Sequence, residues 1–135
     1  MSAASPTPKP IDALPTQTVR RLGGRDIDEL RRWAAQAGHR FVLVECSDCV
    51  DKTSVLKAIG RAFAFPEWYG ANLDALYDCL TDLPERRQPG WVVVLERLPG
   101  EPTFKVEDRD ALLDVFRDAA EDFARQHVGL RVFHS

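Results

Sequence analysis

The sequence is poor in cysteine and lacks a long hydrophobic run, and each shortage excludes a class of protein. Three cysteines in 135 residues do not supply the disulfide framework of a small secreted domain, so we expect reduced thiols. The longest apolar runs cover residues 41–44 and 91–95, far too short to cross a bilayer. Prolines interrupt the first fifteen residues, which excludes the apolar stretch of a signal peptide or anchor. The expected location is therefore the cytoplasm, with no membrane partner.

The sequence also lacks the motifs of common catalytic and metal sites. It contains no glycine-rich phosphate loop, no nucleophile elbow and no histidine at a recognisable spacing from a nucleophile. His39, His127 and His134 show no spacing typical of metal ligands. We therefore expect a protein that is not an enzyme and that binds no metal and no cofactor.

Charge is distributed unevenly along the chain. Residues 1–40 carry seven lysines and arginines against four acidic residues, whereas residues 41–135 carry eleven against seventeen. An acidic body repels the phosphates of DNA and RNA, so no nucleic-acid partner is expected. A cationic protein suits such a surface better, because opposite charges favour and accelerate association.

Three regions are expected along the chain: a flexible tail over residues 1–15, an N-terminal extension over 16–40 and a globular domain over 41–135. The tail is rich in proline, serine and alanine. In the extension a short strand is expected at 16–22, and Asp26 precedes Glu29 by three residues, as in a capping box. This spacing predicts a helix over residues 26–37, which Gly38 would end.

The globular domain alternates between strand-like and helix-like segments. Strands are expected at 41–46, 91–96 and 130–133, and helices at 53–63, from about residue 73, and at 108–126. Parallel neighbours in a sheet need a crossover connection, which helices usually provide. Short apolar strands separated by helices therefore predict an α/β domain with a small parallel sheet.

Residues 65–83, with the sequence FPEWYGANLDALYDCLTDL, are the most informative segment of the chain. Asn72 is a good N-cap for the helix that follows it. On a helical projection, one side carries the leucines at positions 73, 76, 80 and 83. The opposite side carries three acids one turn apart, Asp74, Asp78 and Asp82. Aromatic residues border this acidic stripe: Trp68 and Tyr69 in the preceding loop, and Tyr77 within the helix.

The acidic stripe has two interpretations. Charged helix faces are usually solvated surface, and Asp74 in the first turn interacts favourably with the helix dipole. Asp78 and Asp82 have no such local reason, because aspartate is a weak helix former and like charges one turn apart repel each other. Aromatic side chains beside the stripe are typical of interfaces. The pattern therefore supports a partner-binding surface about as well as a solvated face.

The segment FPEWYGANLDALYDCLT resembles the central motif of the barstar family, in which a loop of proline, aromatic, tyrosine and glycine leads into Asn-Leu-Asp-Ala-Leu. The similarity extends from about residue 41 to the C-terminus and includes LLDVFRDA at 112–119. It implies a three-stranded parallel sheet packed by helices, to which the extension could add a strand and a helix. It also implies an immunity protein or antitoxin that inhibits a cationic bacterial ribonuclease, secreted or part of a toxin, in a 1:1 complex.

The resemblance implies three carboxylates that would bind the ribonuclease. Asp78 matches the family's chief carboxylate, which takes the place of a substrate phosphate in the nuclease site. Asp74 matches a second acidic contact. Asp118 falls where the family often has glutamate, on the long C-terminal helix that faces the same partner.

The remaining expected contacts surround the start of the acidic helix. Trp68 matches an aromatic residue, usually tyrosine, that packs against a catalytic histidine of the nuclease. Gly70 and Asn72 match the turn and the helix start that hold this surface. Tyr77 stands where the family commonly has tryptophan, and Tyr69 lies beside Trp68, so both are included among the expected contacts.

Two other functions remain open on the sequence. Cys46 and Cys49 form a C-x-x-C motif between a strand and a helix, where the motif of a thiol-disulfide oxidoreductase would lie. Asp48 and Asp51 beside it disfavour a thiolate, however. The same fold could also bind a cationic partner that is not a nuclease, because fold does not determine function.

Overall fold

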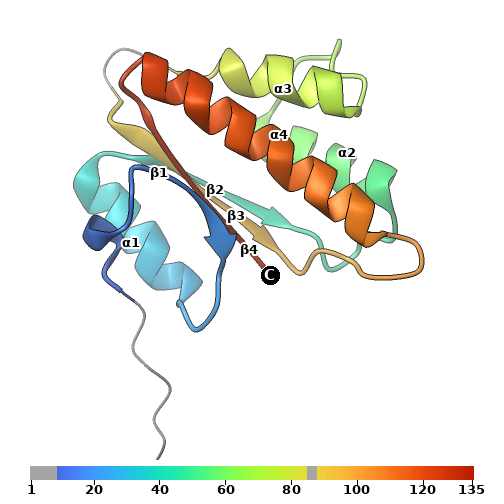
Figure 1. Ribbon diagram of the computed structural model, residues 1–135, viewed down its shortest axis with the longest axis horizontal. Coiled ribbons are helices and arrows are strands. Elements are labelled where there is room, and N and C mark those ends of the chain that lie inside the picture. The colour runs from blue at the N-terminus through green and yellow to red at the C-terminus, as the bar shows by residue number, and fades with distance from the viewer. Residues whose placement is uncertain (1–8, 85–87) are drawn as a thin grey trace, which may run out of the picture.

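The computed structural model describes residues 9–84 and 88–135, and its elements follow the predicted order (Figure 1). The strands are β1 (Gln17–Arg21), β2 (Arg40–Glu45), β3 (Gly90–Glu96) and β4 (Gly129–His134). The helices are a short 3-10 turn, η1 (Ile11–Ala13), then α1 (Ile27–Ala37), α2 (Lys52–Phe63), α3 (Leu73–Thr81) and α4 (Val106–Arg125).

Local signals in the sequence set the ends of α1. The Asp26 side chain accepts a hydrogen bond from the backbone N–H of Asp28 at 3.0 Å, so it caps the second helical residue and not the third. Gly38 ends the helix in a left-handed conformation with φ of 74°, which glycine adopts without steric cost. The helix predicted over residues 26–37 is confirmed.

The four strands form one parallel sheet in the order β1-β4-β3-β2. The family resemblance implies three strands, and the extension supplies the fourth. β1 pairs with β4 from Gln17 opposite Leu130 to Arg21 opposite His134. β4 is therefore an inner strand, and all of its residues are buried.

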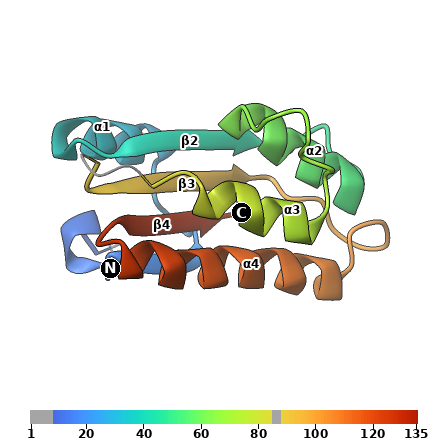
Figure 2. The ribbon, with the colours of Figure 1, turned by 90° about the horizontal axis from the view of Figure 1, so that it is seen from above.

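The direction of the connections explains why both faces of the sheet are covered. The chain crosses from β1 to β2 through α1, then returns through β3 to β4 in the opposite direction. Right-handed connections that run in opposite directions place their helices on opposite faces. Accordingly, α1 lies on one face of the sheet, and α2, α3 and α4 lie on the other (Figures 1 and 2).

Each face of the sheet has its own apolar core. On one side Val92, Val94 and Phe133 pack with Leu30 and Ala34 of α1. The larger core lies beneath α2, α3 and α4 and includes the inner face of α4, which consists of Leu112, Phe116, Ala119 and Phe123. The burial of apolar surface on both faces is the main force that holds the extension and the domain together.

The packed part of the chain begins earlier than the expected boundary at residue 16. Ile11 in η1 and Leu14 after it are buried in the core beneath α1. The tail expected over residues 1–15 therefore joins the fold from η1 onward, while its residues 1–8 lie outside the described part of the chain. Among the helices of residues 9–84 and 88–135, none has the length and apolar character that crossing a membrane requires.

Candidate functional site

The acidic helix begins and packs as its sequence predicts. The Asn72 side chain accepts a hydrogen bond from the backbone N–H of Ala75 at 2.8 Å, which satisfies one of the free donors of the first turn of α3. Leu76 and Leu80 are fully buried, whereas Leu73 and Leu83 are partly buried against the same core. This packing fixes which side of α3 faces outward.

The helices α3 and α4 lie side by side (Figure 2). The outward side of α3 forms one wall of a groove, and α4 forms the other wall. The groove has a volume of about 570 Å³. It brings together four residues that the sequence predicts as partner contacts from two separate helices: Asp74, Tyr77, Asp78 and Asp118. We call this feature, lined also by Leu73, Val115, Glu121 and Arg125, the α3–α4 groove.

The carboxylates of the groove are not neutralised within the described chain. Three ion pairs occur among its residues, and two of them lie on α4, between Arg117 and Asp114 at 2.9 Å and between Arg125 and Asp122 at 3.3 Å. None involves the groove carboxylates, which are exposed to solvent: Asp74, Asp78, Asp118 and Glu121. Their mutual repulsion is therefore not relieved by a direct ion pair among the described residues, and screening or an external cation would lower it.

Glu121 and Arg125 belong to the groove although the sequence analysis did not single them out. Both follow Asp118 at helical spacing, three and seven residues later, so a projection of α4 places all three on one side. Arg125 is the one cation among the lining residues, and Asp122 already binds it. The groove thus keeps an acidic character.

The loop before α3 separates two aromatic neighbours that the sequence places together. Trp68 is 58% exposed and is free to contact a partner. Tyr69 is half-buried against α2, and its hydroxyl donates a hydrogen bond to the Leu56 carbonyl at 2.8 Å. Burial raises the pKa of the Tyr69 hydroxyl to about 12. The structure therefore gives Tyr69 the role of holding the loop, and its hydroxyl is already engaged within the chain.

Gly60 on α2 is what allows Tyr69 to pack so closely. A Cβ atom at position 60 would lie 2.6 Å from Cε2 of the Tyr69 ring, well inside van der Waals contact. On the other side of the loop, a Cβ at Gly70 would lie 3.0 Å from Nδ2 of Asn72, and Ala71 adopts a left-handed φ of 51°. The turn predicted from Gly70 and Asn72 is thus a tightly built junction between α2 and α3.

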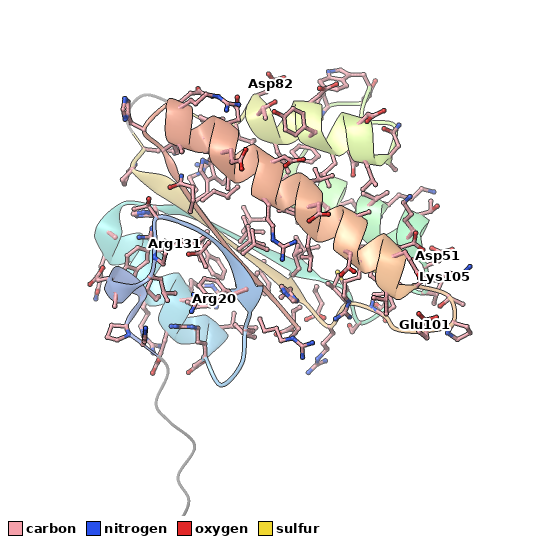
Figure 3. All side chains as sticks on the ribbon, viewed as in Figure 1. Arg20, Asp51, Asp82, Glu101, Lys105 and Arg131 are labelled. Atoms are coloured by element: carbon pink, nitrogen blue, oxygen red, sulfur yellow. The ribbon has the colours of Figure 1, made fainter. Side chains whose placement is uncertain are left out.

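Asp82 lies apart from the other acids of the predicted stripe. It is the C-cap residue of α3 and is absent from the residues that line the α3–α4 groove. Figure 3 shows it at the end of α3. Asp82 therefore offers a matched control, an exposed aspartate from the same helix outside the groove.

The environment of the C-x-x-C motif does not suit redox catalysis. Cys46 is 1% exposed, and burial, with Cys49 and Glu45 nearby, raises the pKa of its thiol to about 12. The Cys49 thiol is 3.5 Å from the Ser54 carbonyl, to which it donates. All three cysteines are free thiols. Since the thiolate is the reactive form, Cys46 is a poor nucleophile, and the structure speaks against an oxidoreductase.

The described residues also contain no cluster of three or more histidine, cysteine or acidic side chains arranged to hold a metal ion. His39 is half-buried at the start of β2, His127 is exposed after α4, and His134 is buried at the end of β4. The three histidines thus lie in three separate environments.

Two comparisons with known proteins relate this chain to others. The family model described as "Barstar (barnase inhibitor)" matches residues 39–135. The chain also aligns with a protein of Bacillus subtilis (strain 168) named "Putative ribonuclease inhibitor YrdF". The alignment is 40% identical over 63 residues and covers 43% of this chain. The aligned region spans 60% of the length of that curated relative. Residues 39–135, which the family model matches, contain both helices that form the groove, α3 and α4.

Proposed function

The chain belongs to the barstar family, and from this premise we propose that it inhibits a barnase-like bacterial ribonuclease by occupying the nuclease's active site in a 1:1 complex. It acts by binding, without catalysis. The role is that of an immunity protein or antitoxin, which protects the RNA of the cell that makes the nuclease. Such a protein works in the cytoplasm, before the nuclease is exported.

The α3–α4 groove is the observation that carries this proposal. A ribonuclease site gathers arginine, lysine and histidine to bind the phosphates of RNA. Two helices place four carboxylates around one groove, and none of them has an ion-pair partner in the described chain. Carboxylates can form bidentate, charge-assisted hydrogen bonds with such cations, as phosphate oxygens do. The groove therefore has the charge and the shape of a substrate mimic.

Position within the groove suggests the role of each contact. Asp78 lies in the middle of α3, with Asp74 one turn before it and Asp118 on the opposite wall. Asp78 would take the place of the phosphate, and the two others would bind cations at its sides. Trp68, which is exposed in the loop before α3, would add apolar contact area as an aromatic anchor.

Charge also favours rapid association with the nuclease. The exposed carboxylates attract a cationic partner over distances of about 10 Å at 0.1 M salt. When the partner's cations enter the groove, they remove the repulsion among the carboxylates. Fast, salt-sensitive binding is therefore expected.

The proposal is tested by titrating the full chain into barnase and two other secreted barnase-like ribonucleases, with cleavage of a fluorogenic RNA as the readout. We expect activity of at least one nuclease to fall linearly to zero at one equivalent of inhibitor. Raising the salt concentration should lower the association rate markedly and change the dissociation rate much less.

Two results would contradict the proposal. One is full activity of all three nucleases with excess inhibitor whose fold is confirmed by circular dichroism. The other is equal inhibition after Asp74, Asp78 and Asp118 are together replaced by asparagine. Retained binding of a cationic protein that is not a nuclease would then favour the same fold with a different class of partner.

A further inference from the structure

A buried arginine lies on the face of the sheet opposite the α3–α4 groove. Arg131 in β4 is 5% exposed, and Figure 3 shows it on the α1 side of the sheet. None of the ion pairs among the described residues involves it, and its Nε has no hydrogen-bond partner there. A buried charge without an ion pair is costly, and burial lowers the pKa of Arg131 although the charge of Asp12 partly opposes this.

Three side chains from separate parts of the chain form a cluster with this guanidinium: Trp33, His39 and Asp12. The guanidinium lies 4.9 Å from the centre of the Trp33 ring in α1, a distance typical of a cation–π contact. Its Nη1 is 3.3 Å from Nε2 of His39, at the start of β2. The rings of Trp33 and His39 pack at 4.7 Å, and Trp33 Nε1 donates to Asp12 Oδ1 at 3.0 Å.

The geometry requires a neutral His39. A guanidinium has donors only, so Nε2 of His39 must accept the hydrogen bond and carry no proton. The other ring nitrogen, Nδ1, is 3.2 Å from the carbonyl oxygen of Ala37, which can only accept, so the proton belongs on Nδ1. A second proton on the ring would leave two cations facing each other at 3.3 Å.

This cluster joins the extension to the family domain. His39 is the first residue that the family model matches, whereas Asp12 and Trp33 belong to the extension. Beneath them lies an apolar face of the sheet, formed by Val92, Val94 and Phe133. A change that weakens the contacts within the cluster would therefore also weaken the packing of α1 on this face.

We propose that His39 and Arg131 form a proton-sensitive latch that strengthens the docking of the N-terminal extension on the sheet, and that protonation of His39 loosens this docking while the groove side stays folded. Two charged groups face His39, Arg131 from β4 and Asp12 from η1. The Asp12 carboxylate, which accepts from Trp33 Nε1, would attract an imidazolium, but the Arg131 guanidinium, whose Nη1 is 3.3 Å from Nε2 of His39, opposes a second proton on the ring more strongly. From α1 the facing group is the uncharged Trp33 ring. The latch does not depend on the ribonuclease or on the α3–α4 groove.

The direction of the pH effect follows from the pKa of His39. Burial is the largest influence and lowers this pKa, and the charge of Arg131 lowers it further, whereas the hydrogen bond to the Ala37 carbonyl and the charge of Asp12 raise it; the net effect is a lowered pKa. A released His39 therefore binds a proton more readily than a docked one. Docking is at full strength above about pH 6.5, the ordinary histidine pKa, and weakens as the pH falls from there towards the lower pKa of the docked state.

Hydrogen exchange measured by mass spectrometry on the full chain tests the latch, at pH values from 8 to 5 and with intrinsic rates corrected. In the wild type we expect amides of α1 to exchange about tenfold faster or more at the acid end, relative to pH 8. Amides of α4 should keep their protection. His39→Gln can accept and donate the same bonds without a charge, so its α1 should stay protected at acid pH. His127→Gln, at an exposed histidine, should behave like the wild type.

Three outcomes would overturn the latch. Protection of α1 that does not change with pH would show that His39 is not linked to docking. Equal loosening of α1 in His39→Gln and the wild type would assign the effect to another group. Parallel loss of protection in α1 and α4 would show unfolding of the whole molecule. Inhibition of a nuclease, or its absence, has no bearing on these outcomes.

Discussion

Among single residues, Asp78 shows most clearly how stability and binding separate. Its carboxylate points into the α3–α4 groove and has no partner in the described chain. It shares α3 with Asp74 one turn earlier and Asp82 one turn later, and like charges at that spacing repel each other. The fold does not need this side chain.

Asp78→Ala should therefore leave the melting temperature unchanged or slightly raised, with a gain of a few tenths of a kcal/mol. Binding to the nuclease should weaken by about 3–5 kcal/mol, because the partner's buried cations lose their counter-charge. That corresponds to a loss of affinity of more than a hundredfold. Calorimetric titration and melting curves on the same preparations would measure both quantities.

Asp82→Ala is the control for this experiment. It removes the same charge from the same helix outside the groove, so it should change the affinity far less and act mainly on association at low salt. Equal affinities for Asp78→Ala and the wild type, or a loss of binding that merely follows unfolding, would exclude Asp78 as the chief contact.

At the scale of elements, the junction between α2 and α3 positions the loop that carries Trp68. Tyr69 fills the space that Gly60 leaves open, and its hydroxyl bonds the Leu56 carbonyl. The loop thus takes its position from a helix that does not itself line the groove. A substitution on α2 can therefore affect binding without touching the partner.

Gly60→Ala tests this coupling, because its expected effect on stability is opposite to that of most glycine-to-alanine substitutions in helices. Alanine in place of glycine normally stabilises a helix interior by about 0.5–1 kcal/mol. Here the added Cβ would lie 2.6 Å from the Tyr69 ring, so we expect a loss of about 1–3 kcal/mol from overpacking. Affinity for the nuclease should fall as well, since the loop with Trp68 must shift. Denaturant unfolding and titration calorimetry would measure the two effects.

Ala64→Gly at the end of the same helix is the matched substitution. Ala64 has a left-handed φ of 55°, which glycine adopts more easily, so this change should stabilise the protein or leave it unaffected. A stabilising Gly60→Ala would mean that Tyr69 moves aside at no cost, and the proposed role of the junction would be wrong.

Helices and strands were predictable from the sequence to the extent that their signals are local. Asp26 and Gly38 mark the ends of α1, and Asn72 marks the start of α3, because capping involves only residues within a turn. The position of Tyr69 was not predictable. Its burial depends on Gly60, which lies on α2, nine residues earlier in the chain, and no local sequence pattern indicates such a contact.

The same reasoning applies to the groove. Helical spacing predicted that Asp74 and Asp78 share a face of α3, and the family resemblance added Asp118. That the two helices lie side by side is a tertiary fact, and Glu121 becomes part of the site only through it. The pairing of Arg131 with His39 had no signal in the sequence, since Arg131 lies in β4 and His39 lies just before β2, a strand that is not a neighbour of β4 in the sheet.

For the whole molecule, the extension determines how much of the sheet is protected from water. Leu30 and Ala34 of α1 cover Val92, Val94 and Phe133, and β1 pairs with β4 along its length. Without the residues before His39, that apolar face would be open and β4 would lie at an edge of the sheet. Exposed apolar faces and unpaired edge strands favour aggregation.

Removal of residues 1–38 should therefore lower both the melting temperature and the solubility of the protein. Leu30→Ala is the milder version and should cost about 2–5 kcal/mol through the cavity that it leaves, or about 8 °C or more in melting temperature. Gln36→Ala, at an exposed position of the same helix, should have little effect. Thermal melts and light scattering would decide, and a truncated chain as stable and soluble as the full one would refute the packing role.

The order of the strands also has a consequence for how the chain is made. β4 is the last strand to leave the ribosome, yet its place is between β1 and β3, inside the sheet. Of the four strands, β1 is synthesised first, but its partner β4 is synthesised last. The sheet therefore closes only after residues 129–134 have been made. Contacts this distant in sequence form slowly, and unfinished chains expose apolar strands in the meantime. A ribosome that stalls before β4 would therefore release a chain that lacks the centre of its sheet, a natural target for chaperones and proteases.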